Sequence, residues 1–165
     1  MNPLSRFLAL FTLSVAMLHP VQAATLAGKV VGITDGDTLT LLDTTNTQYK
    51  IRLAGIDTPE KGQPFGQVCK QTLSDLVFNQ PVEIQWDKAD RYGRVIGKVL
   101  KSGEDINLEQ IKLGCAWHYK KYQNEQSPED REKYSSAETN ARGARLGLWA
   151  DPNPVAPWDW RHRSR

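Results

Sequence analysis

The fold is decided by residues 25–56, which have the sequence TLAGKVVGITDGDTLTLLDTTNTQYKIRLAGI. Three segments of this stretch are rich in apolar and β-branched residues: 26–33, 38–42 and 49–54. Turn-forming residues separate them, as Asp35-Gly36-Asp37 and as Asp43-Thr44-Thr45-Asn46. This pattern predicts three consecutive strands joined by short turns, which together form a meander.

Downstream of the meander the pattern changes to a helix and then returns to strands. Apolar residues at helical spacing predict a helix at 65–78. Apolar and β-branched runs predict strands at 82–86 and 95–100. A short helix is predicted at 106–113, and Gly114 is expected to end it in the left-handed conformation.

A last helix has the clearest signal of all. Ser127 is a good cap and Pro128 suits the first helical position. Apolar residues then repeat at intervals of about three and four, through an interior Gly143: Tyr134, Ala137, Ala141, Ala144 and Leu148. The order of elements predicts an α+β protein, a five-stranded OB-fold barrel with about three packed helices.

Composition excludes several classes of protein. The 165 residues are 24% charged and 39% hydrophobic, with a formal net charge of +2. This length and apolar content predict one folded domain instead of a disordered chain. No apolar run of the sequence reaches the ~18 residues of a membrane span. The small net charge argues against a highly basic packaging protein.

Residues 1–23 have the pattern of a secretory signal peptide. Arg6 gives the charged start, residues 7–18 the apolar centre, and Val21-Gln22-Ala23 the small residues before a cleavage site. We therefore expect a mature chain of residues 24–165 that is periplasmic or secreted, without membrane attachment after cleavage. A buried first helix or strand is the alternative.

Two cysteines, Cys69 and Cys115, can be paired on paper. An oxidising compartment would permit one disulfide, whereas two buried, reduced thiols are the other possibility. A zinc site is disfavoured, because Cys115 and His118 have C-x-x-H spacing but the sequence offers no second pair of ligands.

Three short polar clusters contain the residues suited to catalysis: Asp35-Gly36-Asp37-Thr38, Arg52 with Asp57-Thr58-Pro59-Glu60, and Asp90-Arg91-Tyr92-Gly93-Arg94. The carboxylates of Asp37 and Asp57 and the Thr58 carbonyl are hard oxygen ligands for Ca²⁺ or a similar cation. Glu60 is placed to deprotonate a water molecule. Arg52 and Arg94 can bind phosphate oxygens and oppose the charge of a transition state. Each cluster alone could be a turn or an ion pair, but together they suit phosphodiester hydrolysis.

These clusters resemble, in order and at compatible spacing, the signature blocks of the staphylococcal nuclease (thermonuclease) family. Gly114-Cys115-Ala116-Trp117 and Gly147-Leu148-Trp149 resemble its later blocks, so the resemblance covers about residues 26–150. It implies an OB-fold domain at 24–150 with Ca²⁺-dependent endonuclease activity. The expected enzyme hydrolyses phosphodiester bonds of DNA and RNA, leaves 3′-phosphates, and works as a monomer without a stable protein partner.

By matching position, the resemblance implies a role for each residue of the site. The catalytic residues are Arg52, Glu60 and Arg94. The Ca²⁺ ligands are Asp37, Asp57 and the Thr58 carbonyl, with Asp35 as an outer neighbour. Tyr92, Tyr119 and Tyr122 are candidates for lining the nucleotide pocket, or else ordinary aromatic residues of the barrel.

The chain departs from the best-known family member in two places. Only residues 61–64 separate Glu60 from the next helix, where that member has a longer, lysine-rich loop. The chain ends in a tail at 151–165 that is rich in Pro, Trp and Arg, and its Trp158–Arg165 part has no counterpart there. Such a tail can pack on the barrel, remain mobile, or contact nucleic acid by stacking and phosphate contacts.

Two rival functions are disfavoured. One phospholipase D motif is imperfectly matched by His118, Lys120 and Glu125, with Glu at the acid position. That family needs two copies of the motif, and this sequence offers one. A catalytically inert OB module that binds nucleic acid or protein is the second rival. It has little reason to retain the full set of carboxylates and arginines, so we expect an active enzyme.

Overall fold

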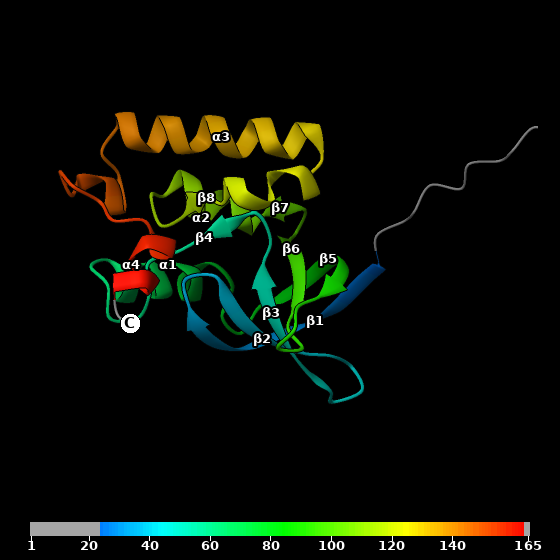
Figure 1. The fold of residues 1–165 in the computed structure, drawn as a ribbon. Coiled ribbons are helices and arrows are strands. Elements are labelled where there is room, and N and C mark those ends of the chain that lie inside the picture. The colour runs from blue at the N-terminus through cyan, green and yellow to red at the C-terminus, as the bar shows by residue number, and fades with distance from the viewer. Residues whose placement is uncertain (1–23, 164–165) are drawn as a thin grey trace, which may run out of the picture.

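Five strands close into a mixed β-barrel in the computed structural model, which describes residues 24–163 (Figure 1). The proposed signal peptide at 1–23 lies outside these residues. The barrel strands are β1 (Ala24–Asp35), β2 (Thr38–Leu42), β3 (Gln48–Leu53), β5 (Pro81–Ala89) and β6 (Val95–Lys101). They lie in the order β3-β2-β1-β5-β6, and parallel pairing of β3 with β6 closes the barrel. The predicted meander and the OB-fold class are confirmed.

Three very short strands complete the β structure. β7 (Glu104–Asp105) extends the sheet beyond β6. β4 (Ile56–Asp57) leaves the barrel and pairs with β8 (Trp117–His118) as a separate two-stranded ladder. β4 and β7 were not predicted, because two residues give no alternating pattern. The β4–β8 ladder matters for function, since it fixes the backbone of Asp57 against the helical half of the molecule.

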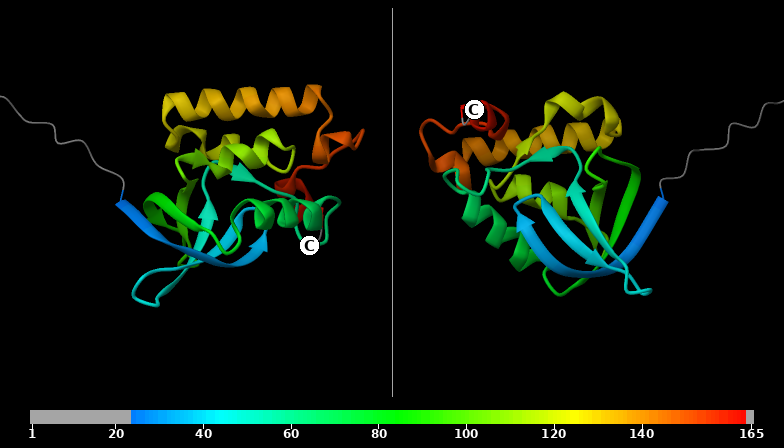
Figure 2. Two further views of the ribbon diagram at one scale, coloured as in Figure 1. Left: turned by 180° about the vertical axis from the view of Figure 1, so that it is seen from behind. Right: turned by 60° about the horizontal axis from the view of Figure 1, so that its bottom comes forward.

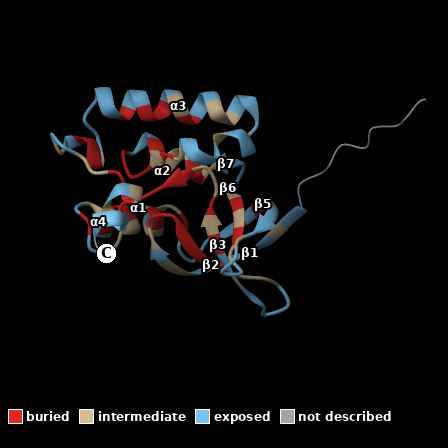
Figure 3. Cartoon of the chain, viewed as in Figure 1, coloured by how far each residue is buried: buried red, intermediate tan, exposed pale blue. Residues whose placement is uncertain are grey.

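The barrel interior is filled by apolar side chains from all five strands. Val30, Leu39, Ile51, Ile84 and Val99 are each fully buried. Figure 3 shows that burial concentrates where the barrel meets the helices, while the outer faces of the strands are exposed. Side chains that face the interior are apolar and alternate with those that face outward, which explains why the strands could be recognised from their sequence.

The helices pack on one side of the barrel (Figure 1, Figure 2). The three predicted helices are confirmed as α1 (Gly66–Val77), α2 (Ile106–Lys112) and α3 (Pro128–Gly143). Two 3₁₀ helices, η1 (Lys120–Glu125) and η2 (Gly147–Ala150), and a C-terminal helix α4 (Pro157–Arg163) add to them. Between residues 24 and 163 no helix combines the length and the apolar character needed to cross a bilayer.

Buried polar side chains attach helix α2 to the barrel. The Asn107 amide donates to the carbonyls of Ala54 and Gly97, at 3.0 and 3.1 Å. The Gln110 amide donates to the Gly36 carbonyl at 2.6 Å, and so supports the turn between β1 and β2. Since buried hydrogen bonds to backbone groups have defined geometry, α2 fixes this turn relative to β3 and β6.

The predicted course of the last helix is wrong at its C-terminal end. Helix α3 ends at Gly143, so Gly143 is not interior, and Leu148 belongs to η2. Arg145 adopts the left-handed conformation with φ 53°, and the Leu146 N–H donates to the Ala141 carbonyl at 3.0 Å. This geometry is a Schellman C-cap, which satisfies free carbonyls and redirects the chain.

Gly114 allows the segment after α3 to pack tightly. Its φ is +70°, and a Cβ at this position would overlap the Leu146 carbonyl. The Leu148 N–H donates to the Gly114 carbonyl at 2.8 Å. Gly114 therefore ends α2 as predicted and also provides the close approach that η2 requires.

The two cysteines lie close together without a bond between them. Cys69 and Cys115 are both free and buried. A hydrogen bond with Cys115 and burial together raise the pKa of the Cys69 thiol. The same hydrogen bond lowers the pKa of the Cys115 thiol.

Candidate active site

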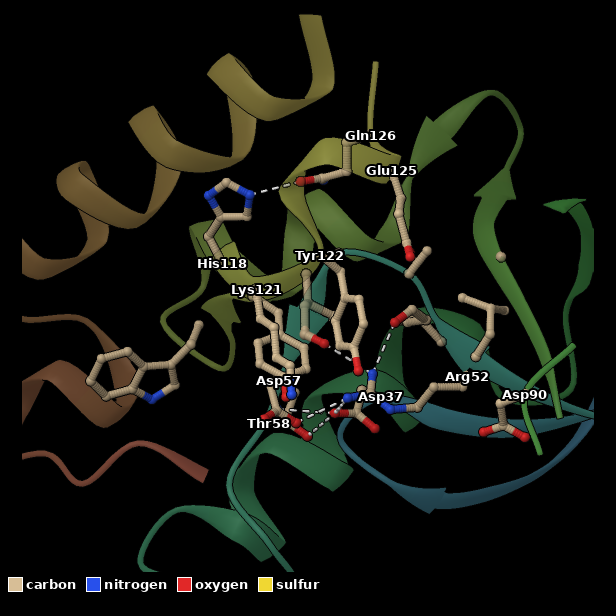
Figure 4. A pocket seen from close by; sticks show the side chains of 18 of the residues that line it. Asp37, Arg52, Asp57, Thr58, Asp90, His118, Lys121, Tyr122, Glu125 and Gln126 are labelled. Carbon is tan, nitrogen blue, oxygen red and sulfur yellow. Dashed lines mark hydrogen bonds and ion pairs between the residues drawn. The ribbon is translucent and has the colours of Figure 1, made fainter. Parts of the chain in front are cut away.

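One large groove, of about 1360 Å³, runs between the barrel, η1 and α4. All nine residues that the sequence suggested for the site line it: Asp37, Arg52, Asp57, Thr58, Glu60, Tyr92, Arg94, Tyr119 and Tyr122. Figure 4 shows Asp37, Arg52, Asp57 and Thr58 gathered together, with Tyr122 and Lys121 pointing toward them from η1. The structure thus brings residues from distant parts of the sequence into one groove.

Strand pairing places the first cation next to the first carboxylate. Thr38 at the start of β2 is the register partner of Arg52 on β3, so Asp37 lies beside the Arg52 backbone. The Leu53 N–H donates to the Asp37 carbonyl at 2.8 Å. The chain then turns at Gly55, where φ is +72°, and β4 returns Asp57 to the same position. A tight turn after β3 is therefore needed to assemble this site.

The Arg52 guanidinium is held on two sides. Its Nη1 donates to the carbonyls of Leu53 and Ile56, at 2.9 and 3.0 Å. Its Nη2 lies 2.9 Å from Asp57 Oδ1 and 3.1 Å from Asp37 Oδ2. The side chain is 13% exposed. Arg52 is therefore a rigid, largely buried cation placed between two carboxylates.

Asp37 and Asp57 are buried carboxylates in a crowded negative environment. Asp37 Oδ2 accepts hydrogen bonds from the backbone N–H and the hydroxyl of Thr58, at 3.0 and 2.9 Å. Burial raises the pKa of Asp57, although nearby arginines oppose the shift. Burial and the charge of Asp37 raise the pKa of Asp35 to about 6. Such a group of carboxylates favours the binding of a cation.

Glu60 stands at the edge of this cluster on the loop before α1. Its backbone N–H donates to the Gln63 amide oxygen at 3.1 Å, and its carbonyl accepts from the Gln63 N–H at 2.9 Å. A Cβ on Gly66 would overlap the Glu60 carbonyl, so a glycine is needed there. The side chain is 39% exposed and faces the groove. Glu60 thus combines a fixed backbone with access to solvent, as a general base requires.

Arg94 lies on another part of the groove wall and is held by its own turn. Its Nε and Nη2 each lie 2.8 Å from Asp90 Oδ2. Desolvation is the largest single influence and raises the pKa of Asp90, but hydrogen bonds from the backbone and side chain of Arg94 and from the Tyr92 backbone together lower it. The contacts of Arg94 are therefore with Asp90 and the Tyr92 ring, at 5.7 Å, and not with the carboxylates near Arg52.

The three tyrosines have different environments. Tyr92 is well exposed, and the Arg91 guanidinium lies 4.8 Å from its ring centre. Tyr122 is partly exposed, with the ammonium groups of Lys88 and Lys121 at 6.0 and 5.7 Å from its ring. Tyr119 contacts Tyr122 edge-on, with ring centres 5.0 Å apart. All three are therefore groove residues and none belongs to the barrel core.

The donor set suits a hard divalent cation more than zinc. Asp37 and Asp57 offer carboxylate oxygens within about 3 Å of one nitrogen of Arg52, and Thr58, whose N–H and hydroxyl contact Asp37, is the next residue along the chain. Across residues 24–163, no group of three or more His, Cys, Asp or Glu side chains converges as a metal site. Two carboxylates with a backbone carbonyl, completed by water, is an arrangement that Ca²⁺ accepts.

Arg161 on α4 is the site residue that sequence reasoning missed. Its Nη1 lies 2.6 Å from Glu60 Oε1, and its Nη2 lies 2.8 Å from Asp57 Oδ2. Although partial burial opposes it, hydrogen bonding to these carboxylates raises the pKa of Arg161. The aromatic and basic tail was a signal that this region could approach the groove. Its pairing across about a hundred residues could not be read from sequence.

His118 takes no part in the carboxylate cluster. It is buried, and its Nε2 lies 2.7 Å from the Gln126 amide oxygen (Figure 4). Its backbone N–H donates to the buried Glu138 carboxylate at 3.1 Å. A buried, hydrogen-bonded imidazole is a structural group here, and this geometry disfavours a covalent histidine mechanism.

Comparison with known proteins gives a consistent picture. The model of the family described as "Staphylococcal nuclease homologue" matches residues 50–151. A Haemophilus influenzae protein named "Uncharacterized endonuclease" is 45% identical over 83% of this chain and 74% of its own length. A Shigella flexneri "Micrococcal nuclease" is 42% identical over 92% of this chain and 90% of its own length. An Escherichia coli "Uncharacterized endonuclease" is 36% identical over 87% of this chain and 90% of its own length.

Proposed function

This chain belongs to the staphylococcal nuclease family and is a hydrolytic nuclease, and we propose that it is an exported, Ca²⁺-dependent enzyme. Its proposed substrates are DNA and RNA, and its proposed products carry 3′-phosphates. The observation that supports this most is the gathering of Asp37, Asp57, Arg52 and Glu60 at one groove. Metal ligands, a phosphate-binding cation and a general base are the three components that phosphodiester hydrolysis needs.

Glu60 would act on the attacking water. Its side chain is 39% exposed, against 7% for Asp37 and 1% for Asp57, and its carboxylate is the one that solvent reaches most readily of these three. As the water oxygen bonds to phosphorus, its proton passes to Glu60 and the bond from phosphorus to O5′ breaks. The O5′ leaving group takes a proton from solvent, which gives a 5′-hydroxyl and a 3′-phosphate. General-base assistance of this kind contributes about 10²- to 10⁴-fold to the rate.

The two arginines would bind the phosphate from different sides. Arg52 is fixed by backbone carbonyls, so its charge stays next to the cation site. Arg94 is aligned by Asp90 on the other wall of the groove and is about one-third exposed. A preorganised guanidinium stabilises the charge of the transition state because it needs no reorganisation during the reaction.

The cation would be held by Asp37, Asp57 and the Thr58 carbonyl. When bound, it would neutralise charge on a phosphate oxygen and lower the pKa of a bound water. Arg52 keeps the two carboxylates close together before the cation binds, since its Nη2 contacts both of them.

The remainder of the groove suits a single-stranded or locally opened nucleic acid. Tyr92 and Tyr122 present exposed rings, and basic side chains from Lys88, Arg91 and Lys121 lie beside them. Bases stack on aromatic rings without strong sequence preference, while basic side chains contact phosphates. This arrangement supports a substrate class that includes both DNA and RNA.

The test is cleavage of a short single-stranded DNA and the matching RNA by the wild-type enzyme and by Glu60→Gln. We expect wild-type cleavage in CaCl₂, none in EGTA, and a loss of about 10²-fold or more in Glu60→Gln. Glu132→Gln is the matched control, because Glu132 is exposed on α3 outside the groove. Mass spectrometry of the fragments identifies the 3′-phosphate. Full activity in EGTA, or in Glu60→Gln, would refute the mechanism.

Export is tested separately, by N-terminal sequencing of the protein recovered from periplasm and medium. Cleavage after Ala23 is the expected result. An intact Met1 on protein found only inside the cell would refute it.

A further inference from the structure

Helix α4 brings a second arginine to the carboxylates of the active site. Arg161 Nη1 lies 2.6 Å from Glu60 Oε1 and 3.3 Å from Asp57 Oδ1, while Nη2 lies 2.8 Å from Asp57 Oδ2. The guanidinium therefore binds both oxygens of an expected cation ligand and one oxygen of the expected general base. Asp57 is 1% exposed, so a cation that reaches it must come from within the groove.

Stacking and a backbone contact hold α4 in this position. Trp158 stacks on Tyr119, with ring centres 5.4 Å apart and planes 5° from parallel. Trp158 also meets the Trp117 ring edge-on at 5.5 Å. The Gln63 amide donates to the Val155 carbonyl at 2.6 Å, just before the helix. Trp158 thus covers one face of the Tyr119 ring.

Repulsion among the negative charges of the groove explains why Arg161 binds to its carboxylates. Four carboxylates line the groove near one internal cation, Arg52: those of Asp35, Asp37, Asp57 and Glu60. A second positive charge relieves the repulsion among them, and Arg161 supplies it. A divalent cation coordinated at about 2.3–2.6 Å by Asp57 would supply the same charge. The guanidinium and the cation would then repel each other at the same carboxylate.

We propose that Arg161 is an internal competitor of the catalytic cation, so that α4 closes the active site in the metal-free protein and leaves it when the cation binds. This inference rests on the proposed function, because it uses the proposed cation site. In the closed form Glu60 is bound by a cation and Tyr119 is covered, so neither can serve the substrate. In the open form both are released together, since Trp158 and Arg161 belong to the same short helix.

Ca²⁺ binding without substrate tests the competition directly. Isothermal titration calorimetry would follow CaCl₂ added to EGTA-treated, dialysed full-length protein, as wild type and as Arg161→Gln. Because a competing cation weakens binding, we expect Arg161→Gln to bind Ca²⁺ at least about fivefold more tightly. Arg163→Gln is the matched control, with the same charge change on the same helix at an exposed side chain. It is expected to bind like the wild type.

A second readout follows the helix itself. Tryptophan fluorescence of the wild type should change on Ca²⁺ addition as Trp158 separates from Tyr119, and Trp158→Phe should lose most of that change. Arg161→Lys retains the charge but not the planar fork, so its affinity for Ca²⁺ should lie between those of wild type and Arg161→Gln. If Arg161→Gln folds poorly, the Ca²⁺ affinity of Arg161→Lys can still be compared with that of the wild type.

The outcomes separate the two proposals. Equal or weaker Ca²⁺ binding by Arg161→Gln and Arg161→Lys, with wild-type binding intact, overturns the competition and leaves the proposed function standing. Absence of Ca²⁺ binding in every variant, together with cleavage in EGTA, overturns the proposed cation site and this inference with it. Tighter binding by Arg161→Gln with an unchanged Arg163→Gln supports the proposal.

Discussion

Substitution of Arg52 by glutamine should destabilise the metal-free protein strongly. Its guanidinium makes four contacts of 2.9 to 3.1 Å, two with backbone carbonyls and two with the carboxylates of Asp37 and Asp57. Contacts of charged groups are each worth about 1.5–3 kcal/mol, but contacts on one side chain do not add independently. Removing one partner of a buried ion pair costs about 3–5 kcal/mol, because the other charge stays buried.

We therefore expect Arg52→Gln to lower the free energy of unfolding by about 3 kcal/mol or more in EGTA. For a chain of this size, that corresponds to a decrease of about 6–12 °C in Tm. Because Ca²⁺ would neutralise Asp37 and Asp57, the decrease in Tm caused by Arg52→Gln should be smaller in CaCl₂. Circular dichroism melts in EGTA and in CaCl₂ measure both effects, with Arg163→Gln as the control for loss of an exposed arginine.

Two results would refute this reasoning. A Tm within about 2 °C of the wild type in EGTA would show that the carboxylates do not depend on Arg52. A decrease in Tm of equal size in EGTA and in CaCl₂ would show that the cation does not bind at these carboxylates.

Three further predictions follow from single contacts. Arg94→Gln should reduce cleavage by about 10²-fold or more with little change in Tm, measured by fluorescent-oligonucleotide kinetics, and near-normal kinetics would exclude Arg94 from the reaction. Gly114→Ala should cost about 2 kcal/mol or more in urea denaturation, since its Cβ would overlap the Leu146 carbonyl. Gly103→Ala, also at positive φ but in open space, should cost only about 1 kcal/mol, and equal costs would contradict the overlap. Oxidation should join Cys69 to Cys115 and add roughly 4 kcal/mol, detected by thiol titration and by urea unfolding with and without reductant; two titratable thiols after oxidation would disprove it.

Prediction from sequence worked where a pattern is local. The strands and the three larger helices could be recognised because apolar residues repeat with the period of the element, as in the buried Val82 and Ile84 on β5. The end of α3 could not, because Ala144 and Leu148 continue the apolar spacing while the chain has already turned at Arg145. Apolar spacing reports which residues are buried, and it does not report the backbone conformation between them.

The residues of the site were also recognisable, but their pairing was not. Arg52, Asp57 and Glu60 lie within nine positions, so their proximity followed from one strand and one turn. The partner of Arg94 proved to be Asp90 in its own turn, although the sequence suggested only a free phosphate-binding group. That pairing depends on side-chain direction at a hairpin, which the order of residues leaves undetermined.

The amino-acid sequence by itself determined the barrel, its three main helices, the family and the set of chemically active side chains, because each of these depends on local patterns of apolar residues and short motifs. Only the tertiary structure decided that α4 folds back so that Arg161 meets Asp57 and Glu60, and that Trp158 covers Tyr119. Contacts across about a hundred residues depend on where the β4–β8 ladder and the 151–156 segment direct the chain. The interaction energy that fixes them comes from buried charge and ring stacking, which no spacing in the sequence expresses.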